Sequence, residues 1–325
     1  MEPETLLAAA IQMEARVGDV DANLRMAGEL VDEAARGGAR LIVLPEFFTT
    51  AIAFLPALAD AALPPDGAAT ALLADRARRH DAIVGGSFLC RDADGHVRNA
   101  FVLATPDGVA GRHDKDLPTM WENCFYVGGS DDGIIDAGGV AFGVALCWEL
   151  MRSQTARRLR GEVDAIVGGS GWWSVPAWPP RRRFERLEAG NERLALRVAP
   201  ALGRLVGAPV VHAAHAGSLA CRMPWSPLSY RGHFEGGAQV CAADGRVLAR
   251  RTWREGAGVA MAEIIVARTA PLDTVPDSYW LHRRGWLGTA MWHYQRAHGR
   301  RFYRRTHPRP PAAVARTRSA AWPPV

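Results

Sequence analysis

The sequence of 325 residues has few cysteines and no long hydrophobic run. No stretch of about 18 uncharged apolar residues occurs, so the sequence offers no candidate transmembrane helix. The N-terminal residues Met1–Glu4 are acidic and lack the basic region of a signal peptide. The five cysteines show no paired metal-binding spacing; they are Cys90, Cys124, Cys147, Cys221 and Cys241. These features predict a cytoplasmic protein with free thiols.

Lysine is almost absent. Lys115 is the only lysine among 39 basic residues, and the others are arginines. Because an ammonium group is a compact point charge and a guanidinium is a broad planar fork, arginine cannot replace lysine where space is tight. The single lysine therefore indicates a functional position, with survival by compositional chance as the alternative.

Acidic residues are absent from the C-terminal stretch 281–325, which contains ten arginines. Since the whole chain carries +5, residues 1–280 carry −5. We therefore divide the sequence into a main domain, 1–280, and a basic extension, 281–325. The extension interleaves its arginines with aromatic residues, namely Trp286, Trp292, Tyr294, Phe302 and Tyr303. This mixture favours packing on a protein surface over nucleic-acid binding. We expect a homodimer or larger homo-oligomer in which residues 281–310 cross onto another subunit.

Two apolar runs end in residues with reactive side chains. The run 140–146 ends at Cys147, and the run 41–44 is followed by Pro45 and Glu46. Open α/β sheets place chemistry at the carboxyl ends of strands. Cys147 precedes an expected helix at 152–160, whose dipole should favour the thiolate; a buried core cysteine is the alternative. Glu46 lies beside aromatic residues, so desolvation should raise its pKa and suit it to general-base catalysis; a capping or ion-paired glutamate is the alternative.

Glu46, Lys115 and Cys147, in this order, resemble the catalytic set of the nitrilase superfamily of carbon–nitrogen hydrolases. The resemblance runs from about residue 6 to 266. It also includes Gln12, Asn23, Gly85-Gly86-Ser87, Asn99, Glu122 and Cys147-Trp148-Glu149.

The resemblance implies a covalent mechanism without a metal or an organic cofactor. Glu46 would act as the base and Cys147 as the nucleophile. Lys115 and the backbone N–H of Trp148 would stabilise the developing negative charge, and Glu122 would orient the lysine and the substrate. His212-x-x-His215 is a weak metal motif because it lacks a third ligand in pattern.

The chain alternates strands and helices in two similar halves, which predicts an α/β fold. Strands are expected at 6–13, 41–44, 82–88, 97–105, 140–146, 163–167 and 208–213, and helices at 21–36, 68–80, 152–160 and 183–206. Two further strands, 238–242 and 259–265, should form a hairpin pair. The resemblance implies that the two halves stack as a four-layer αββα sandwich.

The expected substrate pocket is atypical for the superfamily. Leu150, Arg152 and Ser153 stand where a nitrilase would show Asn and then Pro-Leu, which counts against nitrile hydrolysis. The Arg-Ala-x-Glu-Asn segment of the amidases is also replaced, here by residues 188–193. Three tryptophans are candidates for an aromatic pocket wall, with core or interface packing as the alternative: Trp121, Trp172 and Trp173.

The function expected from these features is hydrolysis of a small-molecule amide or carbamoyl compound through a Cys147 thioester. Nitrile hydrolysis through a thioimidate is the first alternative. An acyltransferase that passes the thioester to an amine, and a catalytically silent scaffold, are the others. The intact Glu46, Lys115 and Cys147 argue against the scaffold.

Overall fold

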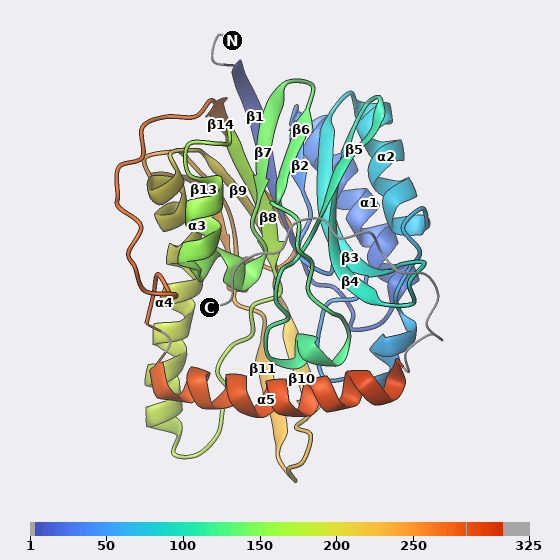
Figure 1. Ribbon diagram of the computed structural model, residues 1–325, viewed down its shortest axis with the longest axis vertical. Helices are drawn as coiled ribbons and strands as arrows, with labels where there is room; N and C mark the ends of the chain where they lie inside the picture. The colour runs from blue at the N-terminus through green and yellow to red at the C-terminus, as the bar shows by residue number, and fades with distance from the viewer. Residues whose placement is uncertain (1–3, 284, 308–325) are drawn as a thin grey trace.

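The computed structural model describes residues 4–283 and 285–307. Within these ranges no helix combines the length and apolar character needed to cross a bilayer. The described residues form a large mixed sheet system flanked by helices (Figure 1).

The first half of the chain builds one sheet with two covering helices. Its strands are β1 (Glu4–Met13), β2 (Leu41–Val43), β3 (Ile83–Arg91), β4 (Val97–Thr105) and β5 (Gly108–Asp114), and its helices are α1 (Val20–Arg36) and α2 (Ala68–His80). The strand order is β5-β4-β3-β2-β1, and β14 (Gly258–Val266) lies antiparallel to β1 on the other side. β1, β2 and β3 are parallel, so their carboxyl ends point the same way.

The second half repeats this plan. Its strands are β6 (Ile134–Ala137), β7 (Val140–Val144), β8 (Ala165–Ser170), β9 (Val210–His215), β12 (Gly236–Cys241) and β13 (Val247–Thr252), and its helices are α3 (Ser153–Leu159) and α4 (Arg181–Val206). They follow in the order β6-β7-β8-β9-β12-β13. The two sheets meet where Gln12 and Met13 of β1 pair with Ala214 and His215 of β9.

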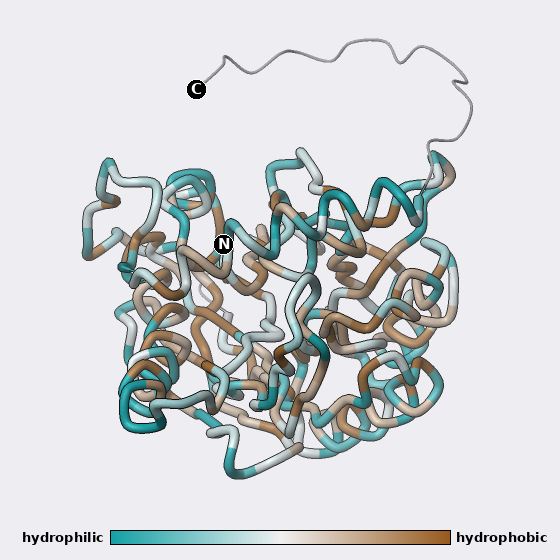
Figure 2. The backbone as a smooth tube through the Cα atoms, turned by 90° about the horizontal axis from the view of Figure 1, so that it is seen from below, coloured by the Kyte–Doolittle hydropathy of each residue, from teal (hydrophilic) through white to brown (hydrophobic). Residues whose placement is uncertain are grey.

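Three apolar layers separate four layers of secondary structure, which confirms the αββα sandwich. Side chains of α1 and α2 pack on one face of the first sheet, and those of α3 and α4 pack on the outer face of the second. The central layer joins the two sheets and includes Val43, Phe101, Phe142, Val167 and Val240. Viewed from below, hydrophobic residues lie mainly along the inner elements (Figure 2). Burying these two-sided strands drives the stacking.

Short elements decorate the sandwich. They are the hairpin of β10 (Ser218–Arg222) and β11 (Ser229–His233), and the 3₁₀ helices η1 (Pro56–Asp60), η2 (Met120–Cys124), η3 (Cys147–Met151) and η4 (Trp253–Glu255). The expected hairpin between 238–242 and 259–265 is wrong. β12 instead forms its hairpin with β13 across the Asp244-Gly245 turn, whose Gly245 has a φ of 83°. β14 returns to pair with β1, which ties the end of the main domain to its beginning.

The C-terminal extension contains a long helix, α5 (Gly285–Thr306), that runs across the lower end of the molecule (Figure 1). The helix packs on η2 of its own chain, where Gly299 faces Asn123. The hydroxyl of Tyr303 also accepts the backbone N–H of Val97, the first residue of β4, at 3.2 Å. The structure therefore places the described part of 281–310 on its own chain, where the sequence analysis expected it on another subunit. Of the interleaved aromatic residues that suggested an interface, Tyr303 is buried and Trp292, Tyr294 and Phe302 are partly buried within this chain, whereas Trp286 is 61% exposed.

Candidate active site

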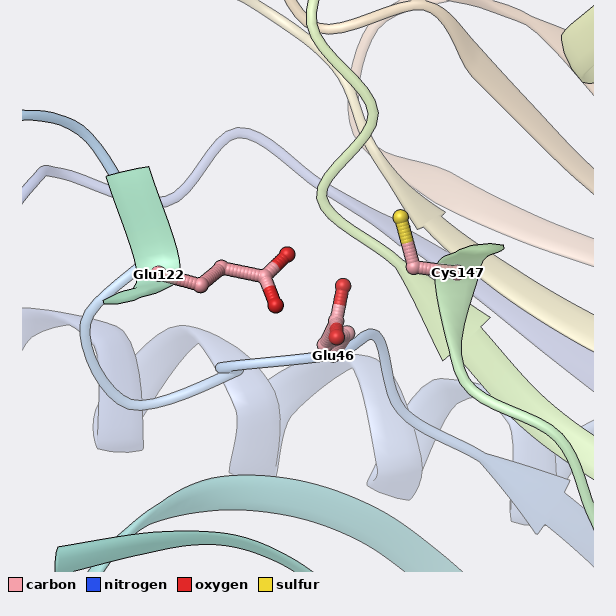
Figure 3. A group of neighbouring side chains, drawn as sticks. All are labelled: Glu46, Glu122 and Cys147. Carbon is pink, nitrogen blue, oxygen red and sulfur yellow. The ribbon is translucent and has the colours of Figure 1, made fainter. Parts of the chain in front are cut away.

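Separate chain segments bring the predicted residues to one place, and Figure 3 shows three of them, Glu46, Glu122 and Cys147. Glu46 follows β2, Lys115 directly follows β5, and Cys147 follows β7 as the first residue of η3. A carboxylate oxygen of Glu46, one of Glu122 and the Sγ of Cys147 all lie within 4.8 Å of one another. All four side chains are buried. The sandwich thus brings together residues that are about 100 positions apart in the sequence.

The carboxylate of Glu46 is held by three donors. Its Oε1 accepts hydrogen bonds from Lys115 Nζ at 2.7 Å and Asn99 Nδ2 at 2.9 Å, and its Oε2 accepts one from the backbone N–H of Gly171 at 3.1 Å. Burial raises the pKa of Glu46 to about 7, although the charge of Lys115 opposes this rise. The sequence analysis expected a pKa shift in this direction. A carboxylate with this pKa can both take and return a proton near neutral pH.

Lys115 lies between two carboxylates. Its Nζ is 2.7 Å from Glu46 Oε1 and 2.7 Å from Glu122 Oε2. Burial lowers the pKa of Lys115, but the charges of Glu122 and Glu46 together raise it above its ordinary value. The lysine therefore stays protonated. Glu46, Glu122 and Cys147 are metal-ligating residue types, yet the ammonium already occupies the position between the two carboxylates where a metal ion would bind.

Glu122 is itself fixed by its neighbours. Besides Lys115, its Oε2 accepts hydrogen bonds from the backbone N–H of Thr119 at 2.9 Å and from the hydroxyl of Tyr126. Its Oε1 accepts no hydrogen bond from the described residues, and Glu122 lines the cavity above Cys147. One oxygen thus positions the lysine, and the other is left without a hydrogen-bond donor among the described residues.

The thiol of Cys147 does not have the lowered pKa that its place before a helix suggested. Burial, and next the charge of Glu46, raise the pKa of Cys147 well above its ordinary value, and Lys115 offsets this only in part. The dipole argument fails because Cys147 begins a single 3₁₀ turn, and α3 starts only at Ser153. The resting nucleophile is a thiol, and it needs a base to become reactive.

Backbone strain is concentrated around these residues. Six non-glycine residues among those described have a positive φ. Three of them adjoin the site: Phe47 (55°) follows Glu46, Met120 (50°) precedes Trp121 and Glu122, and Cys147 itself has a φ of 49°. Left-handed backbone at bulky residues costs energy and persists where the surrounding structure enforces it, commonly at functional sites.

A buried ion cluster supports the turn that carries Cys147. Glu149 Oε2 accepts the backbone N–H of Leu146 at 2.9 Å, and its Oε1 accepts that of Asp116 at 3.0 Å. His113 lies 3.3 Å from the same carboxylate, and Asp131 binds the other side of the His113 ring. Burial opposes the charge of His113, but Glu149 and Asp131 raise its pKa to about 9. This cluster connects the segment before Cys147 with the segment after Lys115.

A cavity of about 790 Å³ opens above Cys147 and Glu122. The three tryptophans predicted for the pocket line it, namely Trp121, Trp172 and Trp173, and so does Trp148. The Trp121 ring lies edge-on to Trp173, with centroids 5.0 Å apart. The ring centroids of Trp148 and of Trp292 in α5 are 5.3 Å apart, so the C-terminal helix supports this wall. The aromatic surface suits an apolar or planar substrate group.

Several supporting residues were not assigned a role from the sequence. Asn99 belongs to the resemblance motifs, and its hydrogen bond to Glu46 explains its place there. Gly171 and Tyr126 carry no local signal, since each acts through a contact with a distant segment. His215 donates its Nε2–H to the carbonyl of Glu46 at 2.8 Å, and His212 Nε2 lies 3.1 Å from Ser170 Oγ. These two histidines therefore brace strand ends, and their contacts do not converge on one metal position.

Comparison with known proteins agrees with this architecture. A family model described as carbon-nitrogen hydrolase matches residues 7–273. The chain belongs to the carbon–nitrogen hydrolase family, and it is an enzyme of that type, within the nitrilase superfamily. A protein named nitrilase from Pyrococcus abyssi is 32% identical over 185 residues, which cover 55% of this chain and 70% of that protein.

Solved structures share the fold at low identity. A carbon-nitrogen hydrolase from Helicobacter pylori superposes with a TM-score of 0.66 at 19% identity, covering 81% of this chain and 89% of the other. A variant of an amidase from Nesterenkonia sp., with acrylamide added to its active site cysteine, gives a TM-score of 0.60 at 18% identity, covering 84% and 96%. At these identities the likeness concerns the fold alone.

Proposed function

We propose that this enzyme hydrolyses a small-molecule amide or carbamoyl compound through a thioester on Cys147. The observation that carries the proposal is the position of Glu46, whose carboxylate contacts the Lys115 ammonium and lies close to the Cys147 thiol. This arrangement supplies a base, a nucleophile and a fixed positive charge within one buried volume. We assign Glu46, Lys115 and Cys147 the catalytic roles, and Glu122 a substrate-orienting role.

Glu122 favours an amide over a nitrile. Glu122 lines the cavity, and its Oε1 accepts no hydrogen bond from the described residues. An amide or carbamoyl group can donate an N–H to this oxygen, but a nitrile nitrogen has no proton to donate. A substrate without a donor would leave a partly buried carboxylate oxygen unpaired, which is costly.

The first half of the reaction is acylation. The Glu46 carboxylate takes the Sγ proton of Cys147 as the sulfur attacks the carbonyl carbon. The Lys115 ammonium and the backbone N–H of Trp148 stabilise the resulting oxyanion. Glu46 then returns the proton to the leaving nitrogen, so ammonia or an amine departs and a thioester remains. Because the resting thiol has a raised pKa, proton transfer must accompany attack rather than precede it.

The second half is hydrolysis of the thioester. Glu46 takes a proton from a water molecule, whose oxygen attacks the thioester carbon. The oxyanion forms again at Lys115 and collapses, and Sγ leaves with the proton held by Glu46. The products are a carboxylic acid and the original thiol, so one water is consumed for each C–N bond broken. None of these steps calls on a metal or an organic cofactor.

Nitrile hydrolysis is the second candidate, because the Pyrococcus abyssi relative is named a nitrilase. In that reaction Cys147 would form a thioimidate, and two waters would be consumed. Transfer of the thioester to an amine instead of water is a third route that the same residues support. A silent scaffold is disfavoured by the strain retained at Cys147, since a fold without chemistry gains nothing from a φ of 49° there.

The test uses matched substrate pairs, such as phenylacetamide and phenylacetonitrile, and N-carbamoyl compounds, with ammonia and acid as readouts. We expect the wild type to turn over amides or carbamoyl compounds faster than nitriles. Intact-mass spectrometry should detect an acyl adduct on Cys147 during turnover. Cys147→Ala should abolish both turnover and adduct.

Cys241→Ala is the matched control, because Cys241 is buried in β12 and does not line the cavity. It should keep activity. Turnover that survives in Cys147→Ala, or an adduct on another cysteine, would overturn the assignment. Faster turnover of the nitriles would replace the amide with the second candidate, and product formation only when an amine is added would replace it with acyl transfer.

A further inference from the structure

Three arginines on one face of α4 line the active-site cavity. Arg186, Arg193 and Arg197 all line the space that contains Cys147. They are seven and four residues apart, so a helix with 3.6 residues per turn places them on the same face. Arg193 and Arg197 are one turn apart, about 6 Å along the axis, so both guanidinium groups can reach the same small group.

These arginines have no acidic partner in the described part of the chain. All three side chains are exposed, and no carboxylate lies within ion-pair distance of any of them. Of the three acids on α4, Glu188 pairs with His233 and Glu192 with Arg254, and Glu185 forms no ion pair with the described residues. Among the described residues that line the cavity, Glu122 is the only acid, and its carboxylate is bound to Lys115, while four arginines line the same space: Arg186, Arg193, Arg197 and Arg283. The cavity therefore has an uncompensated positive charge.

The segment that leads into α5 adds to this charge. Arg283 lines the same cavity. Burial, and next the charge of Arg197, lower the pKa of the neighbouring His282. Arg197 is thus close to His282, which directly precedes Arg283. Arg193, Arg197 and Arg283 form what we call the arginine rim.

The arginine rim is held in a fixed relation to the catalytic residues. Trp172 donates its Nε1–H to Asn191 Oδ1 of α4 at 3.1 Å, and Leu194 packs on the cluster that contains Cys147, Trp148 and Trp172. The surface between Cys147 and the rim is therefore apolar and aromatic. A bound molecule would meet the nucleophile at one end, an aromatic wall along its body and guanidinium groups at the other end.

We propose that the substrate is an anionic amide: a C–N bond to be cleaved at one end, an apolar or aromatic spacer, and a carboxylate at the far end bound by the arginine rim. This inference rests on the proposed function and names its substrate class. Guanidinium groups bind carboxylates through paired, charge-assisted hydrogen bonds, and an adjacent apolar wall strengthens such contacts by excluding water. The proposal makes Arg193 and Arg197 the residues that select the substrate.

The test compares each acid with its neutral methyl ester. The panel contains 4-carboxyphenylacetamide and the monoamides of dicarboxylic acids with four to eight carbons. We expect at least one acid to exceed its ester in kcat/KM by at least ~10-fold, mainly through KM, with the preference falling as salt increases. The double variant Arg193→Gln, Arg197→Gln should reduce the acid-to-ester ratio by at least ~10-fold. The charge reversal Arg193→Glu, Arg197→Glu should instead favour an ω-amino amide.

Arg78→Gln on α2 is the control, because Arg78 is exposed and distant from the cavity lining. It should leave both kcat/KM values unchanged. Binding of the panel to Cys147→Ala by calorimetry gives a readout that needs no turnover.

Three outcomes would contradict the proposal. If the amide bond of the neutral esters is cleaved as fast as that of the acids, and Cys147→Ala binds both equally, the anionic substrate class is wrong while the proposed function stands. If acids bind better but no amide is cleaved, the proposed function is wrong. The inference is then also wrong, because the bound acids are not substrates. A double variant that changes the oligomeric mass and lowers turnover of acid and ester equally would assign the arginines to an interface, and would also overturn the proposal.

Discussion

Arg152 forms a buried ion pair with Asp116, and the pair joins the two loops that carry the nucleophile and the lysine. Arg152 lies five residues after Cys147, and Asp116 directly follows Lys115. The Arg152 side chain is fully buried and that of Asp116 is 15% exposed. Arg152 Nη2 also donates to the carbonyl of Leu117 at 3.3 Å. The residue that departs from the nitrilase pattern in sequence is therefore part of the support of the site.

Breaking this pair on one side should be costly. Arg152→Met leaves Asp116 buried without its partner, so we expect a loss of about 3–5 kcal/mol in the free energy of unfolding, measured by urea denaturation. The double variant Arg152→Met, Asp116→Leu should recover much of this loss, because no unpaired charge remains. Arg246→Met is the comparison, since Arg246 pairs with Asp244 at the surface, where their side chains are 72% and 44% exposed. If the two single variants lose similar stability, the buried pair does not have the role that we assign to it.

Lys115 can be tested against its nearest mimic. Lys115→Arg keeps the charge, but a planar guanidinium does not fit between the Glu46 and Glu122 oxygens, each 2.7 Å from the ammonium. We expect kcat to fall at least ~100-fold, the scale for loss of an oxyanion donor. Circular dichroism should verify that the variant is folded. A variant that retains more than about a tenth of the activity would mean that the single lysine is a compositional remnant.

The pH dependence of activity should follow Glu46. Its carboxylate form is the base, and burial raises its pKa to about 7. We therefore expect kcat/KM to fall tenfold per pH unit below about 7 and to level off above it. The pKa of Lys115 is raised, so the lysine should stay charged across this range. A pH profile that turns near 4.5, the ordinary value for glutamate, would show that burial does not control this group.

The same shift predicts a change in stability. Because folding raises the pKa of Glu46, the folded state binds the proton more tightly than the unfolded state. The contribution of Glu46 to stability is therefore fully present below pH 4.5 and is lost as the pH rises through about 7. Glu46→Gln cannot titrate, so its melting temperature should fall less than that of the wild type over this interval. Parallel melting curves for the two proteins would contradict the assignment.

The sequence indicates the residues that the structure brings together at the candidate site, because each of them ends or follows a core segment. Glu46 and Cys147 are visible as ionisable residues at the ends of apolar runs, and Lys115 is visible because it is the only lysine. The pKa of Cys147 was predicted in the wrong direction, since burial depends on segments that a local dipole argument does not include. The α4 arginines could be assigned to a helix but not to a cavity, because that requires the position of the helix axis relative to Trp172 and Cys147. Homo-oligomer formation stays a prediction.

The contact between α5 and η2 decides whether the C-terminal helix belongs to the active site. A Cβ added at Gly299 would lie 2.6 Å from Asn123 Cβ and 2.8 Å from the Asn123 backbone carbon, so Gly299→Ala must push the helix away from η2. We expect a loss of about 1–3 kcal/mol in stability. Because η2 carries Trp121 and Glu122, activity should fall as well.

Gly190→Ala in α4 is the matched substitution, since nothing lies within 4 Å of its added Cβ. That variant should gain about 0.5–1 kcal/mol from helix propensity. Denaturation curves and kcat/KM for the two variants measure both effects. If Gly299→Ala is as stable and as active as the wild type, α5 does not hold η2 in place, and the described part of the extension is free to serve the subunit contact that its aromatic and basic residues first suggested.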